Sequence, residues 1–259
     1  GNGGILGLVN FSDARYETFV ETPGYERMAV GEQRNAIYIP CRDLLIVKGQ
    51  EVPTQHGHVL VMGLGHGIHL KENRTVEDTL KEAQGSSGIL IVDHPCYVAG
   101  IGQYIKEHPT YIEQFDGFET HNAEADLWLP RVTPRHANQE AGKLFKSLPD
   151  DFLGSVGEIA TSNGHSFYEV GRSWTGLEMP TSYAAWKGNG DFTATLRRAI
   201  WAQRYSREIT PHELKGKEKQ FQRKSGRFGC LDHIVDLAFI VNVAPRIGLG
   251  KMFETERPR

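Results

Sequence analysis

The segment GILIVDHP, residues 88–95, gives the strongest indication of the fold. Its four consecutive apolar residues, 89–92, leave no polar face, so the segment predicts a strand that is covered on both sides. The polar residues Asp93 and His94 follow at once, at the end of a strand where α/β proteins commonly place ligand-binding groups. We therefore expect a buried strand of a parallel sheet with functional groups at its carboxyl end.

Similar apolar runs recur along the chain and alternate with helical patterns. The periodicity predicts strands at 5–11, 44–49, 58–64, 88–93, 116–120 and 155–161, and helices near 75–84, 100–107, 136–147 and 191–205. Thr75 and Asp191 are expected as helix N-caps. The stretch 12–43 predicts a long, irregular, polar loop. The alternation of strands and helices indicates βαβ units, arranged in a barrel or a doubly wound sheet.

The bulk composition narrows the class of protein. A chain of 259 residues with 39% hydrophobic residues can bury a substantial core. Its net charge of −3 gives no overall attraction to nucleic acids or membranes. Three widely spaced cysteines predict neither a disulfide framework nor a zinc knuckle, and favour a reducing compartment. The apolar runs are too short to span a bilayer and no signal sequence opens the chain, so we expect a soluble, cytoplasmic protein without a membrane partner.

Histidine or carboxylate side chains mark five successive predicted strand boundaries. They include Glu51, His58, His94, Glu119 and His165. One such residue would ordinarily cap a strand or satisfy the core. Five in series favour a single polar site on which they converge.

These residues lie in short motifs: 49–51 (GQE), 57–60 (GHVL), 93–95 (DHP), 116–122 (DGFETHN) and 162–165 (SNGH). In this order the motifs resemble the PHP (polymerase and histidinol phosphatase) family over roughly residues 5–205. The resemblance implies a distorted (β/α)7 TIM-like barrel covering 1–205, followed by a C-terminal helical extension. It also implies up to three divalent metals at the strand ends and hydrolysis of phosphate esters.

The resemblance implies one complete set of metal ligands, Glu51, His58 and His94. One carboxylate and two imidazoles suit Zn²⁺, Mn²⁺ or Fe²⁺. Other family motifs are depleted: no H-x-H precedes residue 56, residues 9–11 (VNF) stand where T-D-H is expected, and Asn163 replaces an aspartate. His165 is implied as a ligand of this second, poorer centre.

We therefore expect a metal-dependent phosphoesterase that hydrolyses a nucleotide or another small phosphorylated substrate with metal-activated water. The candidate catalytic residues are His165 as a general acid or phosphate contact, Asn163 as a hydrogen-bonding partner of phosphate, and Arg172 as a bidentate phosphate contact. An ordinary exposed loop is the alternative for Arg172. The alternative function is a catalytically degenerate PHP-like binding or scaffold protein.

The C-terminal part has a different character. Residues 197–227 carry ten basic side chains against three acidic ones, with Trp201, Tyr205 and Phe221 interleaved. Such a pattern could bind nucleic acid, but charge runs of this kind are more often a solvated basic surface, which is the favoured interpretation. The extension 206–259 also contains an apolar stretch, 231–243, which would pack on the barrel or on a partner. The sequence leaves the oligomeric state open.

Overall fold

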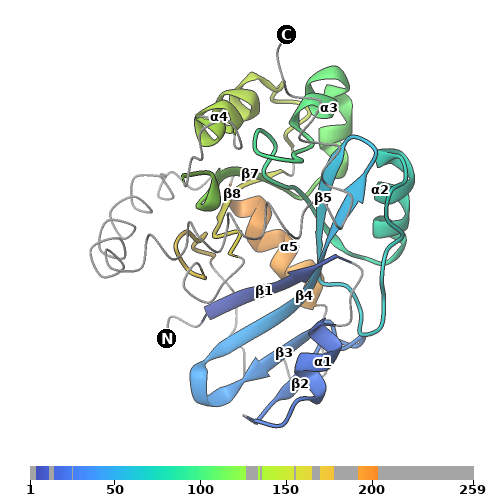
Figure 1. Cartoon of the computed structure of the whole chain (residues 1–259), viewed down its shortest axis with the longest axis vertical. Helices are drawn as coiled ribbons and strands as arrows, with labels where there is room; N and C mark the ends of the chain where they lie inside the picture. Colours follow the sequence, from blue (N-terminus) through green and yellow to red (C-terminus); the bar gives the residue numbers. More distant parts are fainter. Residues whose placement is uncertain are drawn as a thin grey trace.

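A computed structural model describes residues 4–11, 15–24, 26–126, 134, 136–154, 156–164, 170–177 and 192–203. Within these residues, eight strands form one mixed sheet with helices packed against it (Figure 1). The expected α/β class is confirmed. The strand pairings of the described residues form an open sheet, without closure into a barrel.

The strands are β1 (Gly4–Asn10), β2 (Met28–Val30), β3 (Ala36–Ile39), β4 (Leu44–Thr54), β5 (Gly57–Met62), β6 (Ile89–Val92), β7 (Gly117–Asn122) and β8 (Gly157–Thr161). The α-helices are α1 (Arg15–Glu21), α2 (Val76–Gly85), α3 (Gly102–Glu107), α4 (Ala137–Ser147) and α5 (Phe192–Ala202), and the 3₁₀ turns are η1 (Pro40–Arg42), η2 (Pro109–Gln114) and η3 (Glu124–Asp126). All six predicted strands and all four predicted helices are present. Thr75 caps α2 by accepting a hydrogen bond from the Asp78 N–H, and Asp191 lies outside the described residues.

The sheet runs in the order β2-β3-β4-β5-β6-β7-β8, with β1 beside β4. The expectation of mostly parallel neighbours is wrong, because four of the seven described ladders are antiparallel. Only Gln55 and His56 connect β4 to β5, and a connection this short joins antiparallel strands only. β5 is antiparallel to both of its neighbours, β4 and β6, so β4 and β6 run the same way. β1 is parallel to β4, and β7 and β8 are parallel to β6, so these five strands share one direction.

The long strand β4 has a different neighbour on each edge. The Lys48 N–H donates to the Asn35 carbonyl, and the Lys48 carbonyl accepts from the Gly63 N–H. Because the N–H and C=O of one strand residue point to the same edge, β3 and β5 share one edge of β4 and β1 takes the other. Asn10 pairs with Gln50, so the residue after β1, Phe11, lies close to Glu51.

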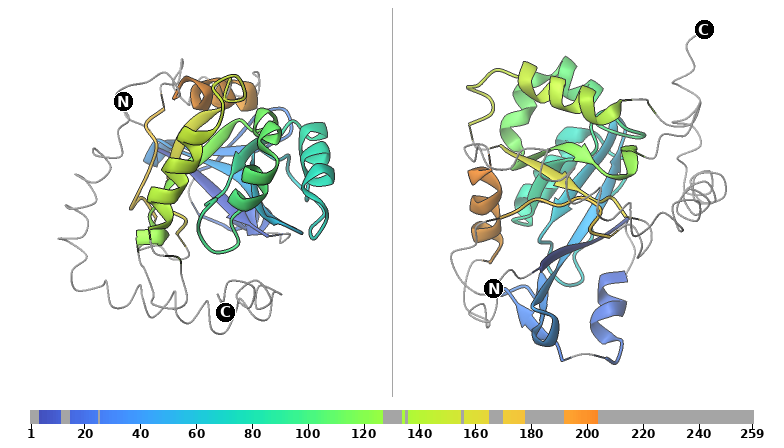
Figure 2. Two further views of the ribbon diagram at one scale, coloured as in Figure 1. Left: turned by 90° about the horizontal axis from the view of Figure 1, so that it is seen from above. Right: turned by 90° about the vertical axis from the view of Figure 1, so that its left-hand side faces the viewer.

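Both faces of the central strands are buried, as residues 89–92 predict. Side chains alternate across a strand, so neighbouring residues enter different cores. One core contains residues of β5 and β6 together with α2, α3 and α4, and the other contains their alternate residues together with α5. Figure 2 shows α5 apart from the group formed by α2, α3 and α4. A sheet covered on both faces leaves its strand ends as the place for a site.

The prediction of an irregular loop over 12–43 is wrong for its described part, which contains α1, β2 and β3. All four residues of β3 are buried, and β3 pairs with the first half of β4. Strands of three and four residues are too short to show a clear periodicity, and their formation depends on pairing with a distant strand.

The described start of the basic segment lies in α5, which packs against the sheet. Asp116 accepts from the Trp201 indole at 3.1 Å and pairs with the Arg197 guanidinium at 3.1 Å. Arg197 also donates to the carbonyls of Ser87 and Gly88. These two residues of α5 therefore anchor the helix to the sheet, and nucleic-acid binding then depends on the exposed Arg198 and on residues from 204 onward.

Residues 204–259, including Tyr205, Phe221 and the extension 206–259, lie outside the described residues. None of the described helices has both the length and the apolar character that crossing a lipid bilayer requires.

Candidate metal centre

The β4–β5 hairpin places Glu51 and His58 on one face of the sheet. Glu51 is paired with Leu60, two residues from His58, so the two side chains are diagonal neighbours. Nδ1 of His58 contacts Oε1 of Glu51 directly. His58 is buried and Glu51 is half-buried. The hairpin alone therefore brings together two groups of the kind that bind metals.

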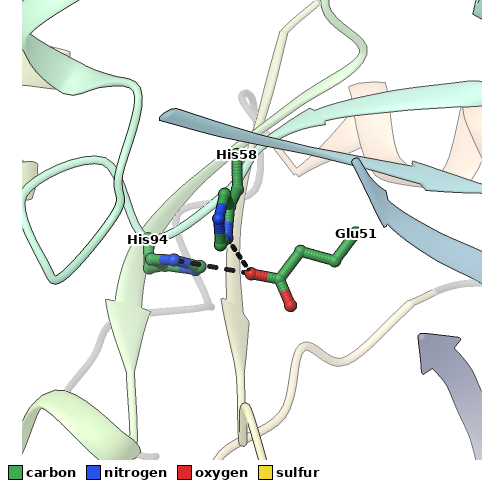
Figure 3. Close-up of side chains that lie close together, drawn as sticks. All are labelled: Glu51, His58 and His94. Carbon is green, nitrogen blue, oxygen red and sulfur yellow. Dashed lines mark hydrogen bonds and ion pairs between the residues drawn. The ribbon is translucent and has the colours of Figure 1, made fainter. Parts of the chain in front are cut away.

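The third group, His94, comes from the end of β6, the strand next to β5. The rings of His58 and His94 are nearly perpendicular, with centroids 5.8 Å apart. Nε2 of His94 lies 3.8 Å from Oε1 of Glu51. In Figure 3 both imidazoles approach the same carboxylate oxygen. The structure thus brings together the three residues that the family resemblance implies as one ligand set.

The donor set fits a divalent cation. The three potential ligand atoms lie within 4.8 Å of one another. His58 Nε2 is buried without a hydrogen-bond partner, which is unusual for a buried polar atom and marks a site whose polar contacts are incomplete. One carboxylate oxygen with two imidazole nitrogens suits Zn²⁺, Mn²⁺ or Fe²⁺.

Backbone contacts fix His94 in an unusual conformation. Its φ of +23° lies in the left-handed region, which non-glycine residues seldom adopt. Its N–H donates to Oε2 of Glu119 at 2.6 Å, and the following loop returns so that the carbonyl of Ala99 accepts from the His58 N–H at 2.8 Å. Gly100 permits this return, since a Cβ at that position would lie 2.2 Å from the His94 carbonyl oxygen. The loop after β6 therefore holds His94 against His58.

A second acidic cluster lies behind His94. Side-chain atoms of Asp93, His94 and Glu119, all buried, lie within 4.8 Å of one another. Oε1 of Glu119 accepts from the Thr161 hydroxyl, and Oε2 accepts from Asn122 at 3.3 Å as well as from the His94 N–H. Since protein donors contact both oxygens, Glu119 supports the loop from the neighbouring strand.

The charges around His94 are unbalanced in favour of carboxylates. Burial alone would lower the pKa of His94, but Asp93, Glu51 and Glu119 outweigh it and raise that pKa well above its usual range. Burial, followed by repulsion from Asp93, raises the pKa of Glu119. Carboxylates in low-dielectric surroundings repel one another, so this part of the molecule favours positive charge.

The remaining predicted site residues are not joined to this group by any described contact. Asn163, with φ +41°, donates to Oε2 of Glu124 at 2.6 Å. Arg172 lies in the segment 170–177 beyond β8, and its Nη1 is buried without a hydrogen-bond partner. His165 lies outside the described residues.

Sequence reasoning placed Phe11 and Asp93 in motifs but did not anticipate their contacts with the ligand set. The half-buried Phe11 ring meets the His58 ring edge-on, with centroids 5.9 Å apart, at the position where the resemblance would imply the imidazole of a T-D-H motif. The contact could have been anticipated had β1 been placed beside β4. Asp93 was visible within the DHP motif, but its contact with the His94 ring was not.

Comparisons with protein-family models, with curated proteins and with solved structures find no match for this chain. The resemblance to the PHP family therefore depends on the five motifs and on the geometry of the residues within them.

Proposed function

We propose that the chain is a metal-dependent phosphoesterase of the PHP type, acting on a nucleotide or another small phosphorylated substrate. The observation that carries the proposal is the convergence of Glu51, His58 and His94, from three separate motifs, on one point. The distorted (β/α)7 barrel is part of this proposal: the parallel pairs β1–β4, β6–β7 and β7–β8 fit it, whereas the antiparallel pairs β3–β4, β4–β5 and β5–β6 depart from it. The shared direction of β1, β4, β6, β7 and β8 places the carboxyl ends of these strands at one edge.

The cation would be Zn²⁺, Mn²⁺ or Fe²⁺, held by Glu51, His58 and His94. When bound, such a cation polarises a phosphoryl oxygen and lowers the pKa of a water molecule. The protein holds and orients the ligands: the hairpin fixes Glu51 relative to His58, and the loop after β6 fixes His94. Phe11 shields one side of His58 from water.

Groups that follow β8 would contact the phosphate. Arg172 has a buried guanidinium nitrogen without a hydrogen-bond partner, and guanidinium groups bind phosphate oxygens in a bidentate manner. Asn163 would donate a hydrogen bond but has no basic group. His165 would protonate the leaving group. Their shared position after β8 supports this assignment, because β8 ends at the same edge as β6 and β7.

A catalytically degenerate scaffold is the second candidate, and Phe11 favours it. The Phe11 ring takes a place beside His58 but offers no ligand, and Asn163 is a poor cation ligand. With a single cation, much of the phosphoryl charge is left to protein groups, and each missing electrostatic partner costs about 3–4 kcal/mol of transition-state stabilisation. We therefore expect slow turnover rather than efficient catalysis.

Hydrolysis of a chromogenic phosphomonoester and phosphodiester, with Mn²⁺ or Zn²⁺ added, tests this function. The wild-type protein should show turnover that needs the added metal. Glu51→Gln should reduce it by at least about 100-fold, because it removes the carboxylate that both imidazoles approach. Glu32→Gln, the same change at an exposed residue outside the site, is the matched control and should retain full turnover.

Absence of turnover in the wild-type protein with every metal would reject the phosphoesterase function. If such a protein still bound a cation, the scaffold function would gain support.

A further inference from the structure

The His94 ring has a carboxylate near each of its two nitrogens. Nε2 faces Glu51 at 3.8 Å, on the side of the candidate ligand set. Nδ1 lies 3.0 Å from Oδ2 of Asp93, on the opposite side. Asp93 is 7% exposed, so little water competes for this contact. The contact between Nδ1 and Asp93 is an ion pair. It does not have the geometry of a hydrogen bond, because the Nδ1–H bond does not point at the carboxylate oxygen.

Metal-binding imidazoles generally donate their second N–H to a carboxylate or carbonyl oxygen. This contact fixes which nitrogen carries the proton, orients the ring and makes the other nitrogen a better ligand. Asp93 is the group whose carboxylate contacts Nδ1 of His94 in the described residues. Since Asp93 directly precedes His94, the strained backbone of His94 and the support of Glu119 set the relative position of carboxylate and ring.

We propose that Asp93 is a positioning residue for His94: by contacting Nδ1 it presents Nε2 to a cation shared with Glu51 and His58. The inference rests on the metal centre of the proposed function, but it does not require that the protein hydrolyse anything. It assigns a role to a buried carboxylate that the ligand set does not use.

The geometry favours this role over a second cation site built from Asp93, His94 and Glu119. Both oxygens of Glu119 already accept hydrogen bonds from the protein, so neither is directed toward a cation. Nδ1 is the side of His94 away from Glu51. Among the described residues, the ring of His94 is therefore the partner of the Asp93 carboxylate.

Stability and cation affinity should respond differently when Asp93 is replaced. Without a cation, the Asp93 carboxylate repels Glu119, and both are buried. Removing it relieves that repulsion but also takes away the carboxylate paired with the His94 ring, so the two effects on the urea midpoint of the metal-stripped protein oppose each other. A residue needed only for folding would change the midpoint and leave the cation affinity of the folded protein unchanged. The loss of affinity is specific to a positioning role.

Calorimetric titration of the metal-stripped protein with Zn²⁺ tests the inference. Asp93→Ala should weaken binding by about 10–100-fold, the usual effect of removing such a supporting contact. Asp93→Asn should weaken it less, because the amide keeps a polar oxygen beside Nδ1 but lacks the charge of the carboxylate. Asp151→Ala, at an exposed aspartate in the turn before β8, is the control and should bind like the wild type.

A spectroscopic measurement distinguishes positioning from a general loss of structure. In Zn²⁺-loaded protein with ¹⁵N-labelled histidine, His94 should show a protonated Nδ1 and a metal-bound Nε2, and Asp93→Ala should lose this signature. His94→Ala identifies the signal by its absence.

Affinity of Asp93→Ala within about twofold of wild type would overturn the inference, since supporting contacts contribute about tenfold or more. A fall in stoichiometry from two cations to one would also overturn it and assign Asp93 to a second site. Binding by the wild type without any turnover would reject the proposed function alone.

Discussion

Replacing His94 by alanine is expected to weaken Zn²⁺ or Mn²⁺ binding by more than about 100-fold, since loss of a ligand exceeds the 10–100-fold effect of losing a supporting contact. His94 supplies one of three donors, and its ring is buried beside His58. Calorimetry on the metal-stripped protein gives the affinity. His66→Ala, at an exposed histidine in a turn, should bind like the wild type.

Because His94 is buried, alanine also leaves a cavity, so His94→Gln serves as a second variant that preserves more of the volume. Both variants should lose binding while retaining the circular dichroism of the wild type. Wild-type affinity in either folded variant would remove His94 from the site.

Replacing Glu17 by glutamine should lower the free energy of unfolding by about 3–5 kcal/mol, as expected when one member of a buried ion pair is removed. Lys48 on β4 is 2% exposed, and its ammonium contacts the Glu17 carboxylate of α1. Oε1 of Glu17 also accepts from the Gly67 N–H at 2.9 Å. Glutamine would leave a buried ammonium without its counter-charge. Urea unfolding measures the loss, and Glu21→Gln on the exposed side of α1 should change stability by less than about 0.5 kcal/mol.

The same pair predicts a dependence on pH. Burial alone would raise the pKa of Glu17, but hydrogen bonds from Lys48 and the Gly67 N–H outweigh it and lower that pKa to about 2. A carboxyl whose folded pKa is lowered stabilises the protein above its unfolded pKa, near 4.5, and this contribution disappears as the pH falls toward 2. The stability difference between wild type and Glu17→Gln should therefore be full at pH 6 and smaller at pH 3.

A double replacement tests whether the Glu17–Lys48 ion pair is the cause of the loss of stability. Adding Lys48→Met to Glu17→Gln should recover part of the stability, because the unpaired charge is then gone. If Glu17→Gln alone is harmless at pH 6, or if Lys48→Met makes it worse, the ion pair is not what holds α1 on the sheet.

The strands and helices of the central fold could be predicted because their signals are local. Residues 89–92 are apolar without interruption and form β6, which is buried on both faces. Thr75 caps α2 through a hydrogen bond to a residue three positions ahead. Such features depend on near neighbours in the sequence, so no knowledge of the tertiary structure is needed.

Other features depend on contacts between distant segments. β3 has only four residues, and it is a strand because it pairs with β4. Glu51 was expected at the end of a strand, but it lies within β4 because the hairpin to β5 extends that strand. The family motifs brought Glu51, His58 and His94 together, whereas the roles of Asp93 and Phe11 depend on the ring orientation and on β1 lying beside β4.

The most direct test of the metal centre is a crystal of the protein soaked with Mn²⁺ or Zn²⁺ and measured at the absorption edge of that metal. We predict an anomalous peak about 2.0–2.2 Å from Glu51 oxygen and from one nitrogen each of His58 and His94. Glu51→Gln crystals treated in the same way should lose the peak. An anomalous map without a peak between these three side chains, in crystals where the metal binds elsewhere on the protein, would contradict the metal centre.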